Sequence, residues 1–529
     1  MNPPAESERS RDGRGRLVWT APGLLTLVVT LAGIGHAQPW RDELATWSAA
    51  TRPVPDLVRL AGTIDAATGP YYLLMHGWTA LFGTSPTALR LPSALAMAGV
   101  AALTARLGAR LAGPRAGLLA GLLLAMLPVT SRYGQEARPY APATLLAVLS
   151  TLLLVGALHR PTWRRFTGYA VAVAALGLLH LIALTLLAAH ALVVLLVAAR
   201  GPAAAGLEPP AGPPPPPDAA QAVTGEAAPT AGGPADSTPA EAAPAAGARG
   251  PGVIWRWLVA LLPAAVLVAP LVLAAAGQRG RQLDWVRLAR VDDLAALPGA
   301  LAQSGVVGGL LVGLAALGAG RLGRRALLPG AAVLLPVLLL FAAGTAVPLW
   351  VTRYLVFTVP FACLLAGAAL AGVRLAPALA VVTLAGLLGL PDQAALRRTH
   401  EWPRSAPVDY AGVARIVADH EQPGDAVVYS PRDSWLFPDL GLAYHLGARR
   451  PRDVLVMRDQ RQRADLWAAE CDRPAECLAG VDRVWLVVTG RRADPLAAVP
   501  GAKGDALRDA FTVRQVWPRP GLTVALLTR

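Results

Sequence analysis

The stretch QPWRDELATW at residues 38–47 holds two adjacent carboxylates, Asp42 and Glu43, between two tryptophans. It follows the apolar run 17–36, which is long enough to cross a bilayer. Two carboxylates just beyond a membrane are either solvated by water or used in a reaction. Because a carboxylate can accept a proton from a nearby hydroxyl, Asp42 is a candidate general base. Glu43 is a candidate to orient a substrate or to hold an arginine, and a solvated acidic pair is the alternative.

Arginine side chains form a second candidate set. Arg132 and Arg138 lie in SRYGQEARPY (131–140), and Arg353 lies in PLWVTRYL (348–355). All three flank apolar runs, at the expected depth of lipid headgroups. A planar guanidinium binds phosphate through two parallel hydrogen bonds, so the set predicts a site for the phosphate of a polyprenyl-phosphate sugar. The alternative is an arginine that extends to lipid phosphates, and for Arg132 taken alone this alternative is favoured.

These two sets fit the transfer of a sugar from a lipid phosphate to a hydroxyl. The hydroxyl must lose a proton, which Asp42 can accept, whereas the phosphate leaves ionised and needs electrostatic stabilisation more than a proton. One carboxylate with nearby arginines is therefore a sufficient set. No HxxxH or CxxC pairing is present, which predicts no tightly bound metal. A divalent cation between Asp42 and the phosphate stays open.

Composition places these residues in a membrane protein. The 529 residues are 54% hydrophobic and 16% charged, against about 25% charged in soluble domains. The formal charge of +14 does not indicate nucleic acid, because the arginines are spread between apolar runs. A cleaved signal peptide at 1–37 is disfavoured, since its apolar run exceeds the usual length of about 7–15 residues. Span-length runs predict about eleven transmembrane helices: 17–36, 87–108, 114–131, 140–158, 166–180, 182–199, 253–276, 297–319, 326–347, 354–373 and 375–391.

The distribution of arginine predicts the orientation of these spans. With the N-terminus in the cytoplasm, every short arginine-rich connector falls on the cytoplasmic side, as membrane proteins prefer. The connectors contain Arg110, Arg115, Arg160, Arg164, Arg165, Arg200, Arg321, Arg324, Arg325 and Arg374. The acidic pair and the C-terminal part of the chain are then extracytoplasmic.

The chain divides into five predicted parts. These are a cytoplasmic tail (1–16), a transmembrane catalytic region (17–200), a cytoplasmic linker (201–250), a second transmembrane region (251–391) and an extracytoplasmic domain (392–529). The linker is rich in proline, alanine and glycine, which predicts disorder.

The C-terminal part alternates between helical and strand patterns. GDAVVYS, DVLVM, RVWLVVTG and LTVALLT read as strands, so a small α/β domain is expected. It has no glycine-rich phosphate loop. Cys471 and Cys477 are either a disulfide or two free thiols, and Cys363 is expected to pack inside a span.

The ordered motifs RDELATW, GPYYLLMHGWTALFG, SRYGQEARPYA and WVTRYLVFTVPFACLLAG resemble those of bacterial family 39-like members of the C-type glycosyltransferase (GT-C) fold. That group includes protein mannosyltransferases and the aminoarabinose transferase of lipid A, and the resemblance covers residues 15–391. It implies a multi-spanning, inverting hexosyl- or pentosyltransferase that uses a polyprenyl-phosphate sugar on the outer face. Asp42 and Glu43 match its catalytic acidic pair, and Arg138 and Arg353 match its arginines. The family often has His-Pro-Pro before the paired tyrosines, where this chain has Gly-Pro.

The remaining polar and aromatic residues of these segments are the expected lining of the substrate pocket. They are Tyr71, Tyr72, His76, Gln135, Glu136, Tyr140, His180 and Tyr354. His180 interrupts an apolar run, where it marks a turn or lines a cavity. The expected partners are the lipid-linked donor, an acceptor protein, lipid or glycan, and membrane lipids. A transporter or flippase, and a wall-polysaccharide polymerase or ligase, are the competing hypotheses.

Overall fold

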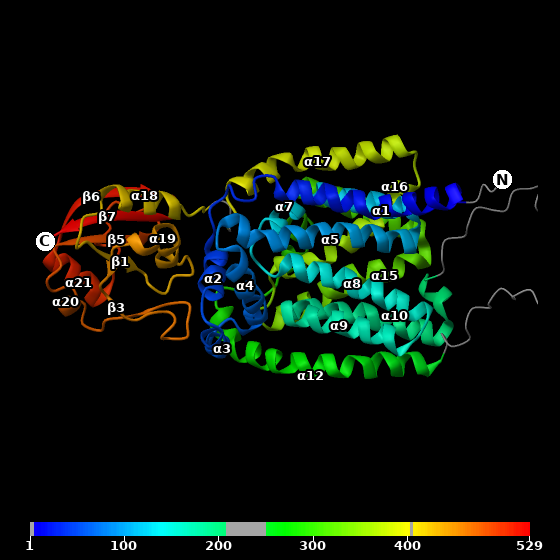
Figure 1. Ribbon diagram of the computed structural model, residues 1–529, viewed down its shortest axis with the longest axis horizontal. Coiled ribbons are helices and arrows are strands. Elements are labelled where there is room, and N and C mark those ends of the chain that lie inside the picture. The colour runs from blue at the N-terminus through cyan, green and yellow to red at the C-terminus, as the bar shows by residue number, and fades with distance from the viewer. Residues whose placement is uncertain (1–4, 208–249, 402–405) are drawn as a thin grey trace, which may run out of the picture.

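The computed structural model describes residues 5–207, 250–401 and 406–529, with side chains from Leu17 onward. A bundle of long helices is followed by a layer of short helices, and a C-terminal domain with a β-sheet lies beyond that layer (Figure 1). The protein is thus a polytopic helical membrane protein with a small C-terminal α/β domain. The predicted linker 201–250 lies almost wholly outside the described residues.

Each predicted span coincides with a helix of the bundle, because long apolar runs are helical wherever they must satisfy their own backbone. The helices are α1 (Ala5–Leu31), α5 (Pro86–Ala112), α6 (Pro114–Met126), α7 (Pro128–Gly134), α8 (Tyr140–His159), α9 (Trp163–Leu179), α10 (Leu186–Arg200), α12 (Pro251–Gln282), α14 (Gly305–Leu322), α15 (Leu327–Ala346), α16 (Val359–Ala371) and α17 (Leu375–Arg398). The predicted start of the span 297–319 is wrong. A separate helix, α13 (Val291–Ala302), ends at Gln303, whose φ of 61° is left-handed.

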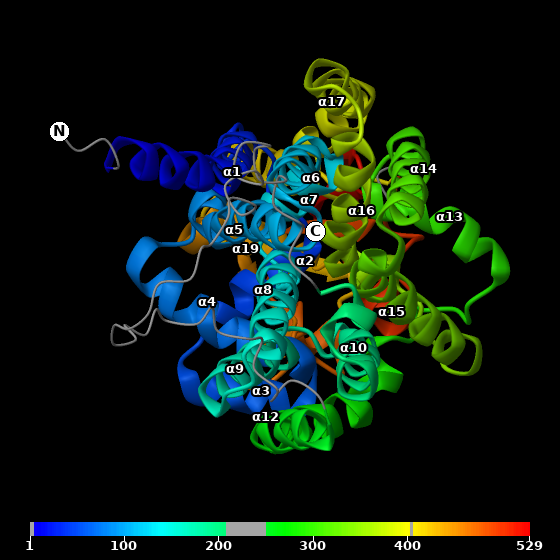
Figure 2. The same ribbon diagram turned by 90° about the vertical axis from the view of Figure 1, so that its right-hand side faces the viewer.

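The number of spans depends on how broken helices are counted. Among the described residues, seven helical runs are long and apolar enough to cross a membrane, or eight if the bent pair α6 and α7 is one span. One run, Gly305–Ala346, holds both α14 and α15, which Figure 2 shows as separate helices. The apolar part of α1 and the 17-residue α9 are shorter than this criterion. Eleven spans therefore stay a prediction.

The break between α6 and α7 positions part of the candidate site. The two helices meet at an angle of 67°. Pro128 begins α7, and a proline disfavours helical backbone in the residue before it. The residue before it, Leu127, is extended (φ −71°, ψ 141°). The bend lets α7 carry Arg132 toward the layer of short helices.

That layer is formed by α2 (Arg41–Ala50), α3 (Val54–Thr63), η1 (Ala66–Thr68) and α4 (Gly69–Phe82). It lies between the bundle and the C-terminal domain (Figure 1). Leu44 and Ala49 of α2 share one buried hydrophobic cluster with Tyr410 and Leu440 of the C-terminal domain. The layer is therefore packed against that domain through a shared hydrophobic cluster.

The C-terminal domain holds a mixed five-stranded sheet in the order β2-β1-β5-β7-β6. β1 (Ala426–Ser430) is parallel to β2 (Arg452–Asp453) and β5 (Arg483–Thr489), and β7 (Leu522–Thr528) pairs antiparallel with β5 and β6 (Thr512–Arg519). The helices of the domain are α18 (Tyr410–His420), α19 (Pro438–Leu446), α20 (Pro474–Cys477) and α21 (Gly501–Ala510).

Two of the strand assignments differ from the sequence pattern. The segment DVLVM does not form one strand but contributes to β2 and to β3 (Val456–Arg458), which pairs with β4 (Ala469–Glu470) in a second sheet. β6 is an additional edge strand, whose exposed and polar residues hide its pattern. Cys471 and Cys477 form a disulfide, and Cys363 is buried in α16.

Candidate active site

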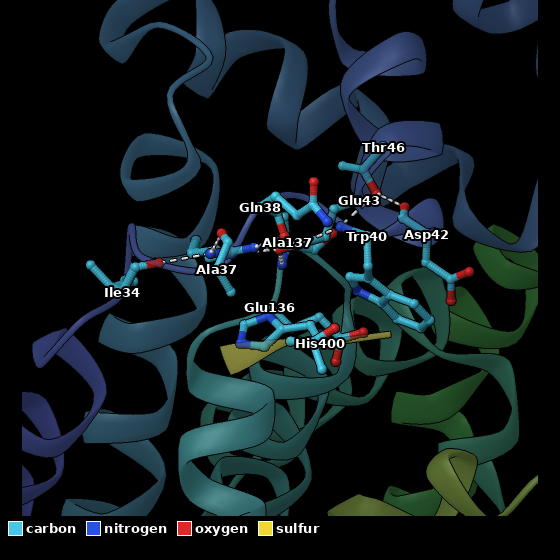
Figure 3. A network of polar contacts seen from close by, with 12 residues as sticks. Ile34, Ala37, Gln38, Trp40, Asp42, Glu43, Thr46, Glu136, Ala137 and His400 are labelled. Atoms are coloured by element: carbon cyan, nitrogen blue, oxygen red, sulfur yellow. Dashed lines mark hydrogen bonds and ion pairs between the residues drawn. The ribbon is translucent and has the colours of Figure 1, made fainter. Parts of the chain in front are cut away.

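Glu43 anchors the start of α2 to the bundle. Its carboxylate accepts hydrogen bonds from Arg90 Nε (2.8 Å) and Nη2 (2.6 Å) and from the backbone N–H of Ala137 (2.9 Å). The backbone N–H of Trp40 adds a longer bond of 3.3 Å. Both charged side chains are 1% exposed. Glu43 thus holds an arginine and two backbone donors, and its oxygens face protein groups (Figure 3).

Arg90 was not identified in the sequence. It lies within the predicted span 87–108, where nothing marks its partner. Its guanidinium also donates to the backbone carbonyls of Ile34 (2.8 Å), Ala37 (2.8 Å) and Gln38 (3.1 Å). One buried arginine therefore holds the chain between α1 and α2, and this chain segment leads directly to Asp42.

Asp42 interacts with a different set of arginines from Glu43, which binds Arg90. Its Oδ2 lies 3.7 Å from Nη2 of Arg353, and both side chains are less than one-fifth exposed. Burial raises the pKa of the Asp42 carboxyl, but arginines lower it further, so that the net pKa lies below its usual value. These arginines are, in order of effect, Arg353, Arg138, Arg41 and Arg132. Asp42 is therefore a carboxylate at neutral pH.

Arg138 is held by residues of the short-helix layer. Its Nη1 lies 3.4 Å from the hydroxyl of Tyr72, which in turn donates to Asp65. Asp65 also accepts from Thr68 Oγ1 (2.7 Å) and from the side-chain amide of Gln282 on α12. The Asp65 backbone has a φ of 58°, which aspartate tolerates better than most residues. This support for Arg138 was not visible in the sequence, because a lone aspartate carries no motif.

Arg132 is buried among protein groups and does not extend to lipid. Its guanidinium lies over the Trp40 ring at 4.7 Å, and it donates to the backbone carbonyl of His400. It also lies 3.6 Å from Glu136. Both Glu136 oxygens lack a hydrogen-bond partner within the described residues, and burial raises the pKa of this carboxyl to about 7.

The connector between α17 and α18 contributes to the same region. His400 is 2% exposed, and burial lowers the pKa of its imidazole far below the usual value. The next residue, Glu401, is also 2% exposed and lies 3.5 Å from Arg41 of α2. The sequence did not suggest that this segment, at the start of the C-terminal part, reaches the region of Trp40 and Glu136 (Figure 3).

Two cavities lie beside the arginines. The first, here called the apolar cavity, has a volume of about 390 Å³. Its apolar lining comes from η2 (Leu181–Thr185), α12 and neighbouring residues. Its polar lining consists of Thr68, Arg138, Tyr140, His180, Arg279, Gln282 and Tyr354. His180 is the residue that follows α9, and its side chain also lines this cavity. It therefore lies both at a turn and at a cavity, the two alternatives that the sequence left open.

The second cavity, here called the charged cavity, has a volume of about 330 Å³. Its charged lining consists of Arg132, Arg353, Arg287 and Asp293, with Trp285 and Trp350 beside them. Arg138 lines one cavity and Arg353 the other, and both lower the pKa of Asp42. Asp42 itself borders neither cavity, but one arginine of each cavity acts on its carboxylate.

Several predicted pocket residues line neither cavity. Tyr71 and Tyr72 are each 1% exposed, and the Tyr72 hydroxyl accepts a hydrogen bond from Arg138. Gln135 donates to the carbonyls of Thr30 and Ala32, both at 2.8 Å, and so ties α7 to α1. The Nδ1 of His76 lies 3.0 Å from the Ala50 carbonyl, within the short-helix layer. Glu136 contacts Arg132 without lining the cavity that Arg132 borders.

No cluster of three or more His, Cys, Asp or Glu residues that could hold a metal ion occurs in the described part of the chain. Asp42 alone would have to bind a divalent cation among four arginines that act on it. Like charges this close make such a site unfavourable.

Comparisons with known proteins bear on the fold of the chain. Residues 69–204 match the family model described as Dolichyl-phosphate-mannose-protein mannosyltransferase. The apo structure of ArnT from Cupriavidus metallidurans matches with a TM-score of 0.58 and 12% identity, over 94% of this chain and 96% of that chain. The chain has the GT-C glycosyltransferase fold.

A second GT-C match is the structure of ArnT from Cupriavidus metallidurans bound to undecaprenyl phosphate. It has a TM-score of 0.57 and 13% identity, over 96% of this chain and 98% of that chain. No curated protein sequence matches the chain. The family match contains Arg90, Arg132 and Arg138, whereas Asp42 and Arg353 lie outside it. The match assigns no role to any of these residues, so their roles stay predictions that rest on the geometry of the candidate site.

Proposed function

We propose that this protein is a membrane glycosyltransferase, which moves a sugar from a polyprenyl-phosphate donor to an acceptor hydroxyl. The observation that carries the proposal is the position of the ionised Asp42 carboxylate between Arg138 and Arg353, each of which lines a separate cavity. A base between two binding spaces can serve a donor on one side and an acceptor on the other. The GT-C fold and the partial family match support the same reaction class.

The donor occupies the apolar cavity in this proposal. Its aliphatic wall suits a prenyl chain, and Arg138 at its polar end suits the phosphate. Tyr140, His180 and Tyr354 supply further polar groups around the phosphate and the sugar. ArnT from Cupriavidus metallidurans, which shares the fold, has been solved with undecaprenyl phosphate bound.

The acceptor hydroxyl approaches Asp42 from the side of the charged cavity. Asp42 accepts its proton while the hydroxyl oxygen forms a bond to the anomeric carbon of the sugar. The bond between that carbon and the phosphate oxygen breaks, and Arg138 and Arg353 stabilise the charge that develops on the leaving phosphate. Attack from the side opposite the phosphate inverts the anomeric centre. Mannose, another hexose or a pentose would all fit this scheme, as would a protein, lipid or glycan acceptor.

The reaction takes place on the outer face of the cytoplasmic membrane in this proposal. The arginine-rich connectors lie at the end of the bundle opposite the C-terminal domain (Figure 1). Because arginine-rich connectors are usually cytoplasmic, we place that end of the bundle in the cytoplasm. The short-helix layer, the acidic pair and the C-terminal domain are then all extracytoplasmic.

Asp42→Asn tests the proposal in proteoliposomes supplied with labelled polyprenyl-phosphate sugars and a cell-envelope acceptor fraction. Transfer is expected to fall by about 100-fold or more, the usual contribution of a general base. Asp505→Asn, at an exposed side chain of α21, is the matched control and should transfer at the unaltered rate. Normal transfer by Asp42→Asn would remove this residue from the mechanism. Flux of the donor across the bilayer without a glycosylated product would instead support a flippase.

A further inference from the structure

A third cavity lies in the C-terminal domain, away from the candidate active site. Its volume is about 650 Å³, and it is bordered by β1, β2, the end of α19 and the segment 459–460. One wall comes from the membrane region: Trp47 of α2. Trp47 follows Asp42 by five residues, which corresponds to about 140° around a helix. The two side chains therefore point to different sides of α2, so the third cavity is separate from the reacting groups.

The carboxylates in the wall of this cavity already have donors. Arg432 binds both oxygens of Asp453 at 2.6 and 2.8 Å and lies 3.6 Å from Asp439. Gln460 donates to the second oxygen of Asp439 at 2.7 Å. Asp459 accepts a backbone hydrogen bond of 2.7 Å. Arg432 thus offsets part of the negative charge of the wall, although it also pairs with Glu470 at 2.9 Å.

Two arginines of the lining have no such compensation. Arg450 and Arg452 both border the cavity and are exposed. Neither guanidinium forms a hydrogen bond or an ion pair in the described ranges 5–207, 250–401 and 406–529. Two guanidinium groups that border one concave space can bind an anion through charged hydrogen bonds at their side of it.

The remaining lining suits a sugar ring. Trp47 is partly exposed and offers an aromatic surface to the C–H face of a pyranose. Gln460 and the carboxylates of Asp439 and Asp453 are hydrogen-bonding groups suited to hydroxyls. We propose that this cavity is a binding site for an acidic saccharide, in which Arg450 and Arg452 bind the carboxylate or phosphate and Trp47 contacts the ring. The site depends on no step of the sugar transfer proposed above.

Ligand-observed saturation-transfer NMR on the full-length protein in detergent tests this site. The probes are methyl glucuronide and glucose 6-phosphate, with methyl glucoside and inorganic phosphate as reference compounds. Both acidic sugars are expected to bind saturably and more tightly than either reference compound. In the double variant Arg450→Gln/Arg452→Gln their binding should weaken by about tenfold or more, as for loss of charged hydrogen bonds. Trp47→Phe should weaken the binding of both sugars and leave inorganic phosphate unchanged.

Arg491→Gln is the matched control, because Arg491 is exposed in the same domain but outside the cavity lining. It should bind both acidic sugars as the unaltered protein does. The proposal is overturned if neither acidic sugar binds, or if inorganic phosphate binds as tightly as glucose 6-phosphate. It is also overturned if Arg491→Gln weakens binding as much as the double variant Arg450→Gln/Arg452→Gln does. Asp42→Asn should retain binding, so a failure of this site and a failure of the transfer reaction are separate results.

Discussion

Arg353 and Asp42 approach to 3.7 Å in this protein, although one follows the penultimate connector of the membrane bundle and the other follows the first helix. Their contact brings a proton acceptor and a phosphate-binding group into one site. It also keeps Asp42 ionised, since Arg353 is the arginine that lowers the pKa of Asp42 most.

Arg353→Gln is expected to reduce kcat for transfer by about 100-fold, as for loss of a preorganised charge at a reacting centre. It should also raise the pKa of Asp42, because its largest stabilising charge is removed. The acidic limb of the rate profile then moves to higher pH, where more of the base is ionised. A pH profile of transfer measures both effects. A lower rate with an unmoved acidic limb would contradict the role of Arg353 beside Asp42.

Tyr72→Phe and Asp65→Asn are expected to raise KM for the lipid-linked donor by about tenfold, the usual effect of losing a hydrogen bond to a charged group. Both changes release Arg138 from the support that Tyr72 provides. Tyr71→Phe is the matched control, since the buried hydroxyl of Tyr71 has no hydrogen-bond partner among the described residues. Steady-state kinetics with varied donor measure the effect. Equal changes in all three variants would indicate a general packing defect.

Arg90→Gln is expected to destabilise the fold by about 3–5 kcal/mol, because it leaves the buried carboxylate of Glu43 without its charge partner. Denaturation of the purified protein in detergent, followed by tryptophan fluorescence, measures the loss. Arg473→Gln, at an exposed pair with Glu476, should change stability by less than about 1 kcal/mol. A small effect of Arg90→Gln would show that the Glu43 contacts do not hold α2 in place.

Glu136→Gln is expected to stabilise the protein in alkaline solution only. The pKa of Glu136 rises from 4.5 to about 7 on folding, so the native state keeps a proton that the unfolded chain has lost. Stability therefore falls as pH rises through this window, and glutamine removes the penalty. The thermal midpoint of the variant should exceed that of the unaltered protein at pH 8 and equal it at pH 5. An equal difference at both pH values would contradict ionisation of Glu136 as the cause.

A reporter fusion tests the orientation. Alkaline phosphatase fused after residue 529 should be active, because the C-terminal domain is expected outside the cytoplasm. The same enzyme inserted within 208–249 should be inactive. The reverse pattern would place Asp42 and both cavities on the cytoplasmic side and would exclude the outer-face reaction.

Local features of the sequence were sufficient to predict the membrane helices. A long apolar run forms a helix in lipid whatever its neighbours are, so each predicted span coincides with a helix. The break after α13 was missed, because a left-handed residue such as Gln303 leaves the hydrophobicity of the run unchanged. The edge strand β6 was missed because such a strand needs no apolar pattern on its exposed face.

The sequence alone also indicated Asp42, Arg138 and Arg353, since a carboxylate and arginines at the outer ends of apolar runs are suited to a base and to phosphate binding. Only the tertiary structure showed that Glu43 binds Arg90, that Asp65 supports Arg138 through Tyr72, and that Arg132 donates to the carbonyl of His400. These contacts join segments that are far apart in the chain. The hydrophobic pattern of a sequence does not identify which charged side chains pair with each other. The physical reason is that helix formation depends on neighbouring residues, whereas the partner of a buried charge is decided by packing.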